Sequence, residues 1–370
     1  FVAGVFMQDQ EHDIEQRYKI DGLSPVQSVT GWPDTIWLTK QLRQDKDKAV
    51  FGELSFDITD NLTATAGARW FEVDNSLKGF FGFADWGWVS SYGEVACPDG
   101  APTFNGAPCS FFDKRVKENG HIGRFNLTWR IDPNKMIYGT WSEGFRPGGL
   151  AVSGDFVRQF RSDHARTVEL GGGWGLPGRG DFDLAASISY TRWRDIQADF
   201  IDDGGLPSTA NIGNGTIWAA SVSGSVRLAP GLRAEAGATL NDSDVDEPVF
   251  IALARLSRIP NIARFSGRAG LAWRRAFDNG TAIEADGWVS YVGKSRLGIG
   301  PELGELQGDY LDSGVIIRFG RENAGLTLTI TNLAGSEGNR FALGTPFATG
   351  REQITPLQPR TIRIGFDTRF

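Results

Sequence analysis

The sequence has little methionine, histidine or cysteine and no long hydrophobic run. Its 370 residues include 2 Met, 3 His and 2 Cys. The histidines, His12, His121 and His164, lie far apart and do not show the spacing of a zinc site. The longest uncharged stretch, 204–226, is rich in Gly, Ser, Asn and Thr, whereas a transmembrane helix needs about 20 mostly apolar residues. The sequence therefore argues against a helical membrane protein.

Basic runs and enzyme motifs are missing as well. Lys and Arg total 38 against 45 Asp and Glu, which gives a net charge of −7 with no basic cluster for nucleic acid. Residues 173–178 match G-x-G-x-x-G formally, but Pro177 lies inside the motif and no helix follows. We therefore expect no catalytic residues, no enzyme activity, no cofactor, no resident metal and no nucleic-acid partner.

The two cysteines lie in one segment rich in Pro, Gly and Ser. Cys97 and Cys109 have no second pair and no histidine cluster beside them. We expect a disulfide that closes one loop, which implies an oxidising compartment. Two free thiols are the alternative.

Alternating strands are the main feature that the sequence does contain. At the end of the chain, apolar side chains share one face and polar ones share the other, which is the period of a two-faced strand. The first face comprises Ile362, Ile364, Phe366, Thr368 and Phe370, and the second comprises Thr361, Arg363, Gly365, Asp367 and Arg369. We expect the apolar face to point outward and the charged face inward.

The same pattern recurs along the chain as hairpins. Short turns are expected at 60–61, 132–135, 229–231 and 278–280, where Asn, Gly or Pro residues cluster. Long connections are expected at 14–42, 78–117, 146–164, 203–213, 245–260, 295–308 and 334–356. This gives about fourteen strands in seven pairs. Short turns alternate with long loops, so every long loop should lie at one end of the sheet.

A soluble β-sandwich would also alternate, but three features favour a membrane barrel. Strands of ten or more residues recur, whereas soluble strands are mostly five or six long. The Ala, Gly and Leu faces are too plain for a close-packed core. Aromatic residues lie at strand ends, where they suit the interfacial girdles of an outer-membrane barrel; these are Trp70, Trp218, Trp273, Tyr291 and Phe370. The predicted fold class is all-β, an antiparallel transmembrane β-barrel of meandering hairpins.

Four segments resemble the TonB-dependent outer-membrane receptors. Residues 137–149, Ile-Tyr-Gly-Thr-Trp-Ser-Glu-Gly-Phe-Arg-Pro-Gly-Gly, resemble a barrel-strand motif of that family that runs into a Gly-Phe-Arg-x-Gly turn. Residues 190–200 are similar to a strand that enters an extracellular loop. Residues 328–333 and 359–370 are similar to the penultimate and closing strands.

The resemblance implies a larger parent protein with a 22-stranded barrel, an N-terminal plug and a TonB box. We expect residues 1–370 to be the C-terminal portion of such a barrel, with the plug and first strands missing, because the chain opens on Phe1 without a signal peptide.

The implied function is TonB-energised uptake of a scarce nutrient across the outer membrane of a Gram-negative bacterium. A ferric siderophore is the leading ligand class, and a carbohydrate, cobalamin or another organic nutrient is the alternative. A passive channel is a rival of a different class. The implied partners are the small ligand, the TonB complex through the missing N-terminal region, and outer-membrane lipids.

The loop at 79–112 carries the candidate ligand site. Its aromatic residues could stack on a planar iron chelate or on a sugar, with Arg146 on the next long loop supplying charge for an anionic chelate. The alternative is that the rings pack on one another or rest on lipid headgroups. The candidate ligand-binding residues are Phe81, Phe83, Trp86, Trp88, Tyr92 and Arg146.

Overall fold

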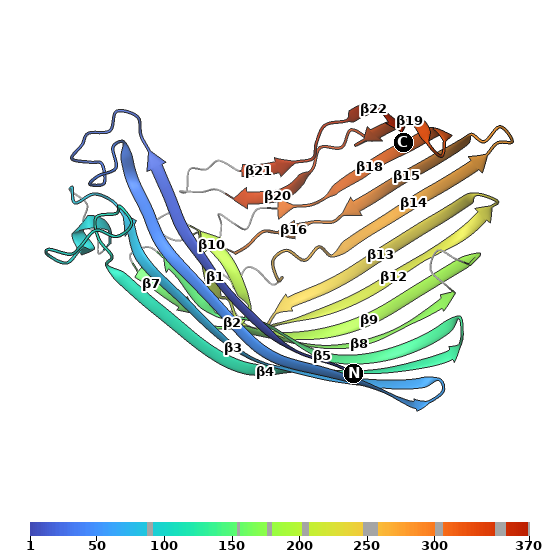
Figure 1. The fold of residues 1–370 in the computed structure, drawn as a ribbon, viewed down its shortest axis with the longest axis horizontal. Coiled ribbons are helices and arrows are strands. Elements are labelled where there is room, and N and C mark those ends of the chain that lie inside the picture. Colours follow the sequence, from blue (N-terminus) through green and yellow to red (C-terminus); the bar gives the residue numbers. More distant parts are fainter. Residues whose placement is uncertain are drawn as a thin grey trace.

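The computed structural model describes residues 1–86, 92–153, 156–175, 180–201, 207–246, 258–299, 306–344 and 353–368. Fourteen strands form one antiparallel sheet in which each strand pairs with its neighbours along the chain (Figure 1). The predicted all-β meander is therefore confirmed. In sheet order the strands are β1 (Val2–Lys19), β2 (Thr35–Thr59), β3 (Leu62–Gly82), β4 (Phe112–Asp132), β5 (Lys135–Arg146), β8 (Asp163–Gly175), β9 (Phe182–Arg194), β12 (Gly215–Ala229), β13 (Leu232–Val245), β14 (Phe265–Ala276), β15 (Ala282–Val292), β18 (Tyr310–Arg321), β19 (Ala324–Thr331) and β22 (Thr361–Thr368).

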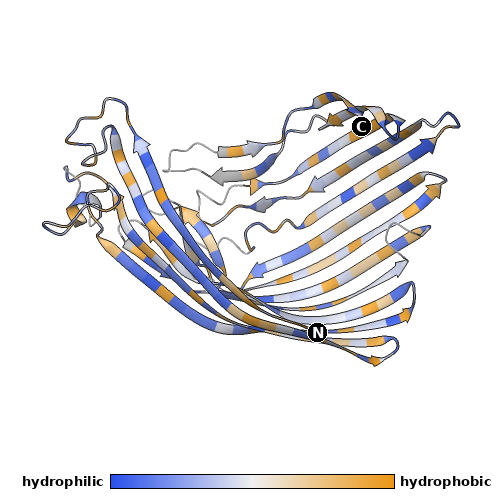
Figure 2. Cartoon of the chain, viewed as in Figure 1, coloured by the Kyte–Doolittle hydropathy of each residue, from blue (hydrophilic) through white to orange (hydrophobic). Residues whose placement is uncertain are grey.

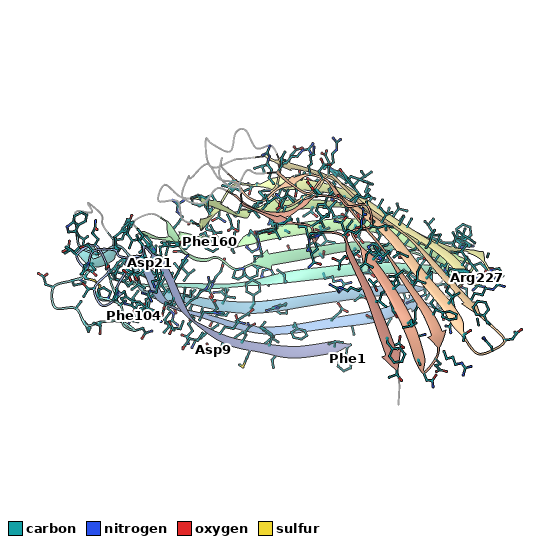
Figure 3. The ribbon with its side chains drawn as sticks, turned by 90° about the horizontal axis from the view of Figure 1, so that it is seen from above. Phe1, Asp9, Asp21, Phe104, Phe160 and Arg227 are labelled. Atoms are coloured by element: carbon teal, nitrogen blue, oxygen red, sulfur yellow. A yellow bond between two sulfur atoms is a disulfide. The ribbon has the colours of Figure 1, made fainter. Side chains whose placement is uncertain are left out.

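Short turns and long connections alternate, as predicted, and the long ones gather at one end of the sheet. Figure 3 shows Asp21, Phe104 and Phe160 at that end and Arg227 at the other. Four long connections contain small hairpins that the sequence analysis did not predict. These are β6 (Gly149–Ser153) with β7 (Phe156–Phe160), β10 (Gln197–Ile201) with β11 (Pro207–Asn211), β16 (Ser295–Arg296) with β17 (Leu306–Gln307), and β20 (Asn339–Gly344) with β21 (Gln353–Pro356).

Three predicted loop limits are wrong. The connection expected at 203–213 spans 195–214, because β9 ends at Arg194. The connection expected at 14–42 spans only 20–34, and the one expected at 78–117 spans 83–111, including the short 3₁₀ turn η1 (Gly93–Ala96). The strands continue through polar sequence because β1, β2, β3 and β4 go on pairing well beyond their apolar parts. Backbone hydrogen bonds continue through these extensions, and their apolar side chains, such as Trp37, Phe80 and Phe112, pack in buried clusters.

Polar and apolar residues alternate along many strands of the sheet (Figure 2), so its two faces differ in character. Cross-strand register places apolar side chains on one common face: Val50, Trp70, Phe125, Trp141, Val168, Ile188, Val222, Leu271, Ile317, Leu328 and Ile364. The opposite face carries charged pairs such as Arg69–Asp47, 3.0 Å, and Arg318–Asp367, 2.7 Å. The hairpins β6–β7 and β10–β11 lie on this charged, concave side, so we call it the lumen face.

The closing strand follows the predicted facing. Ile362, Ile364 and Phe366 share the apolar face, while Arg363 and Asp367 share the lumen face. Arg369 and Phe370 lie outside the described residues. Over the described ranges, the sheet has β1 and β22 as its two edges and curves into an open trough. No helix in the part that the structure describes is long and apolar enough to cross a membrane.

Four lumen-face glycines lie directly opposite an aromatic side chain on the neighbouring strand. The pairs are Gly4 with Phe51, Gly120 with Phe71, Gly171 with Tyr138, and Gly314 with Trp288. In each pair a Cβ on the glycine would come closer than 3.0 Å to the aromatic side chain. The side chain therefore occupies space that only glycine leaves, and it shields the exposed backbone there.

Beyond Trp70 toward the long loops, the outer face of β1–β4 turns into columns of alternating charge. The columns on β1 and β3 are acidic, and those on β2 and β4 are basic. The acidic columns are Asp9, Glu11, Asp13 and Glu15 on β1, and Glu72 and Asp74 on β3; the basic columns are Lys40, Lys46 and Lys48 on β2, and Arg115 and Lys117 on β4. Ion pairs join the columns, for example Lys46 to Asp9 at 3.2 Å and Lys117 to Glu72 at 3.1 Å. Exposed pairs of this kind contribute little stability each.

An arginine introduced on the apolar face of β9 should destabilise the barrel more than one introduced on its lumen face. Ile188 lies on the apolar face, half-exposed, and Ala185 lies on the lumen face of the same strand. Ile188→Arg should destabilise the membrane-inserted barrel by about 2–4 kcal/mol, the cost of Arg near the bilayer midplane. Ala185→Arg should cost less than about 1 kcal/mol because it points into water. Denaturant unfolding of the full-length receptor in liposomes measures both, and equal losses would contradict the facing.

Candidate functional site

An aromatic core covers the lumen wall at the long-loop end. Phe81 has no exposed surface and packs with Trp37, Leu77, Phe112 and Leu150. Its ring centroid lies 5.5 Å from that of Phe112 and 6.1 Å from that of Trp37. Leu150 comes from the β6–β7 hairpin, so this core fastens the hairpin to the inner surface of β2, β3 and β4.

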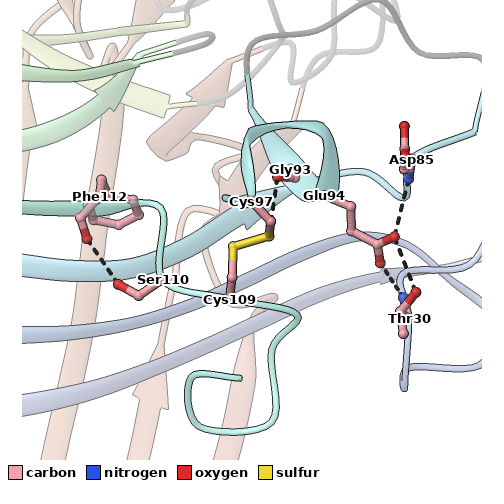
Figure 4. The surroundings of a disulfide bond; sticks show 8 residues. All are labelled: Thr30, Asp85, Gly93, Glu94, Cys97, Cys109, Ser110 and Phe112. Atoms are coloured by element: carbon pink, nitrogen blue, oxygen red, sulfur yellow. Dashed lines mark hydrogen bonds between the residues drawn. A yellow bond between two sulfur atoms is a disulfide. The ribbon is translucent and has the colours of Figure 1, made fainter. Parts of the chain in front are cut away.

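The disulfide lies on the other side of the same wall. Cys97 and Cys109 are bonded, with Cα atoms 5.8 Å apart, and Cys109 is buried against Phe80, Leu38 and Val29 (Figure 4). Phe80 and Phe81 thus lie on opposite faces of β3, because neighbouring residues in a strand point in opposite directions. The β3–β4 connection is anchored on both faces of the sheet.

Glu94 ties the same connection to the β1–β2 loop. Its carboxylate accepts hydrogen bonds from the backbone N–H and hydroxyl of Thr30 and, at 3.3 Å, from the N–H of Asp85 (Figure 4). Two loops that are far apart in the chain are therefore joined through one side chain.

A polar clasp orders the segment that follows β5. Asp163 is almost fully buried and accepts hydrogen bonds from the guanidinium of Arg146, with Nε to Oδ2 at 2.9 Å, and from the backbone N–H of Gln197. Gln197 Nε2 then donates to the carbonyls of Pro147 and Arg161, at 2.9 and 3.0 Å. This clasp joins β5, β8 and the β10–β11 hairpin.

Glu118 of β4 fixes the other side of the segment. Its carboxylate accepts hydrogen bonds from the Ser162 hydroxyl and, at 3.3 Å, from the Gly148 N–H. Asn75 of β3 donates to the Gly148 carbonyl at 2.8 Å. The connection after β5 is therefore held against the lumen wall by directed hydrogen bonds at both of its ends.

A cavity of about 390 Å³ lies between the wall and the two hairpins. Its volume is at the lower end of the range of small-molecule sites. β1 and β2 form one side, β6 and β7 the second, and β10 and β11 the third. The side chains that line it include Gln16, Trp37, Gln41, Arg43, Phe160 and Ser208.

The structure brings some predicted ligand residues together, but as packed core. Phe81, Phe83 and Tyr92 surround Trp37, with ring centroids of Phe83 and Tyr92 at 4.9 and 5.5 Å from it. A completely buried ring such as Phe81 presents no surface to a ligand. Trp86 is 45% exposed and keeps a free face at the loop. Trp88 lies outside the described residues.

Arg146 is also engaged within the protein. Besides its ion pair with Asp163, its guanidinium carbon lies 5.2 Å from the ring centroid of Trp193. Its charge is already balanced by a buried carboxylate. A direct role toward an anionic ligand stays a prediction.

The predicted interface aromatics lie on the apolar face. Trp70 and Trp218 are well exposed, and Tyr291 lies on the same face of β15. Trp273 pairs with Leu232, beside the short turn at the other end. Phe370 lies outside the described residues.

The cavity residues were missed by sequence reasoning. Trp37 and Gln41 fall in the stretch expected to be loop, and Ser208 falls in another. The sequence feature that could have located them is the alternating pattern at 37–43, where Trp37, Thr39, Gln41 and Arg43 share the lumen face of β2.

The model of the family described as TonB dependent receptor-like, beta-barrel matches residues 9–333. The chain belongs to this family. Members are outer-membrane receptors of Gram-negative bacteria, and the extended meander with apolar outer and charged inner faces fits that setting.

Solved structures of the TonB-dependent receptor fold agree with the assignment. The ferric yersiniabactin uptake receptor of Yersinia pestis matches with a TM-score of 0.76 and 15% identity, covering 100% of this chain and 51% of that one. The closed form of the ferric-catecholate import receptor of E. coli K12 gives 0.70 and 17%, with 100% and 51% coverage. A copper transporter, OprC, gives 0.64 and 13%, with 90% and 50% coverage. The chain thus spans about half the length of these receptor structures, and identity this low supports the fold alone.

The bond between Cys97 and Cys109 should hold the β3–β4 connection of this TonB-dependent receptor chain in place. The bridge spans 12 residues, so loop entropy limits its contribution to about 3 kcal/mol. Cys97→Ser with Cys109→Ser should speed proteolysis of 83–111 while the sheet stays intact. Ser110→Ala, which removes only a hydroxyl that donates to the Phe112 carbonyl, is the control. Two free thiols in the denatured, unreduced chain would refute the bridge.

Proposed function

We propose that this chain is the C-terminal barrel portion of an outer-membrane receptor that imports a scarce nutrient with energy from the TonB complex. A ferric siderophore is the proposed ligand class. In the complete protein, a plug and a TonB-contacting region from outside residues 1–370 supply the coupling, and outer-membrane lipids surround the apolar face. The proposed role is transport, without enzymatic activity.

The family match over residues 9–333 carries this proposal. It is supported by the matched structures, which include uptake receptors for ferric yersiniabactin and ferric catecholate. The copper transporter among them is the reason to treat iron as a proposal and not a property of the fold. A carbohydrate, cobalamin or another organic nutrient is the alternative cargo of the same machinery.

The long-loop end supports a receptor more than a passive channel. Two hairpins fold onto the lumen face and are fastened there by the aromatic core and the clasp around Asp163. Such ordered inward elements narrow the entrance and present a shaped surface.

Uptake should depend on TonB. A strain that lacks the full-length gene should lose accumulation of ⁵⁵Fe supplied as chelates extracted from its own iron-starved culture, and the restored gene should recover it. Removing the TonB protein should abolish the recovered uptake, and iron starvation should induce the gene. Uptake that persists without TonB would identify a passive channel. TonB-dependent growth on a sugar or cobalamin, without iron uptake, would change the cargo.

The exposed part of the aromatic loop should contribute to capture of that ligand. Replacing both Trp86 and Trp88 by Ala in the full-length receptor should weaken binding about tenfold or more, because one stacked ring contributes roughly 1–3 kcal/mol. Phe80→Leu, which changes the buried outer-face core, serves as the packing control. Titration on surface-displayed receptor gives the affinities. Unchanged affinity in the double Trp variant would leave this loop as self-packed structure.

A further inference from the structure

Two buried hydrogen-bonding groups in the cavity between β1–β2 and the hairpins lack a protein partner. Gln41 is 5% exposed and Ser208 is 4% exposed, and both line the cavity. Over the described residues, neither Gln41 Nε2 nor the Ser208 hydroxyl has a hydrogen-bond partner. Leaving a buried polar group without a hydrogen bond costs about 1–3 kcal/mol. Native proteins therefore rarely keep two such groups in one cavity unless water or a ligand pairs with them.

The surrounding groups are already satisfied and therefore positioned. Trp37 Nε1 donates to the Thr39 hydroxyl at 3.0 Å, and Gln16 Nε2 donates to the Tyr18 hydroxyl at 2.7 Å. On the hairpin side, the Thr209 hydroxyl donates to Asp199 Oδ1 at 2.7 Å. Among the lining side chains that the structure describes, the buried polar atoms without a partner are Gln41 Nε2 and the Ser208 hydroxyl.

Charge in the cavity is balanced. Arg43 is the basic lining residue, and its Nε is bonded to Asp45 Oδ2 at 2.8 Å. Asp199 adds a carboxylate at the β10–β11 side. Among the lining residues that the structure describes, Arg43 is the one base and Asp199 the one acid, so the lining offers an anionic ligand no net positive charge.

Apolar side chains lie between these polar groups, and the two kinds line the cavity in similar measure. The apolar ones include Ile14, Trp37, Leu150, Val152 and Phe160. Such a mixed lining suits an organic group that carries both a carbon skeleton and oxygen atoms. A volume of about 390 Å³ is also more than ten times the roughly 30 Å³ share of one water.

We propose that this cavity binds a neutral, oxygen-rich organic group, through the amide N–H of Gln41 and the hydroxyl of Ser208. It rests on the proposed function, because the group would be the organic part of the imported nutrient. Hydroxyl or carbonyl oxygens of the ligand replace the hydrogen bonds that water makes to these side chains, and its carbon skeleton lies on the apolar walls. The receptor then recognises the organic scaffold here, and not negative charge.

Substitutions that match the shape of each side chain isolate this contact. Gln41→Leu and Ser208→Ala remove the unpartnered groups without opening a large void, so neither should lower barrel stability. Gln44→Leu on the outer face of the same strand is the matched control, because Gln44 pairs with Ser76 and points away from the cavity.

The test uses the purified full-length receptor and three probes in equilibrium dialysis. Neutral tris(acetohydroxamato)iron(III) and neutral maltotriose represent the two sources of such a group, and trianionic tris(catecholato)ferrate(III) is the charged comparison. At least one neutral probe should bind and lose about tenfold in affinity in each cavity variant, in line with one hydrogen bond of about 1.4 kcal/mol. Gln44→Leu should leave that affinity unchanged.

The outcome also separates the two proposals. Loss with the hydroxamate complex identifies a metal chelate as the source, and loss with maltotriose identifies a carbohydrate. Failure of both neutral probes to bind, equal affinity in all variants, or dependence on Gln41 and Ser208 only for the trianion would overturn the cavity assignment. Those results leave TonB-dependent uptake intact, whereas loss of TonB dependence refutes the proposed function whatever the cavity binds.

Discussion

Backbone hydrogen bonding between neighbouring strands is the interaction on which the rest of this structure depends. Hydrocarbon offers no partner to an N–H or C=O group, so a chain that crosses it as strands must pair each strand on both sides. That requirement fixes the simple meander, the short turns at one end and the placement of all long connections at the other. It also frees the side chains for two separate tasks, contact with lipid on one face and with water on the other.

At the long-loop end the same pairing continues above the apolar band and becomes a scaffold. β2 extends over 25 residues, and its lumen face there carries Trp37, Gln41 and Arg43. Two hairpins dock on this wall, one through Leu150 in the aromatic core and the other through the clasp around Asp163 and Gln197. The cavity is formed by a regular sheet and two hairpins that dock on it. The regular sheet fixes the positions of the polar groups.

The sequence allowed prediction of the features that residues close together in the chain determine. Turns with Pro-Gly or Asn-Gly, and strands with one apolar face, were recognisable without the fold. The upper parts of β1 and β2 were not, because Asp, Glu, Lys and Gln occupy both faces and erase the hydrophobic period. The lumen hairpins and the pair Gln41 and Ser208 depend on contacts between segments far apart in the chain, 167 residues in the case of Gln41 and Ser208. The aromatic loop was ambiguous for a related reason, since composition does not tell whether Phe81 faces a partner ring or a ligand.

The charge columns of β1–β4 and the glycine–aromatic pairs specify two different aspects of strand pairing. A column of one sign tolerates a slip of two residues, because opposite charges still face each other, but it penalises the pairing of β1 with β3 or of β2 with β4. The columns therefore encode which strands become neighbours. A ring that fits only above one glycine, as Tyr138 fits above Gly171, rejects the slipped alignment. Strand order and strand alignment thus depend on different side chains, which lie on opposite faces of one sheet.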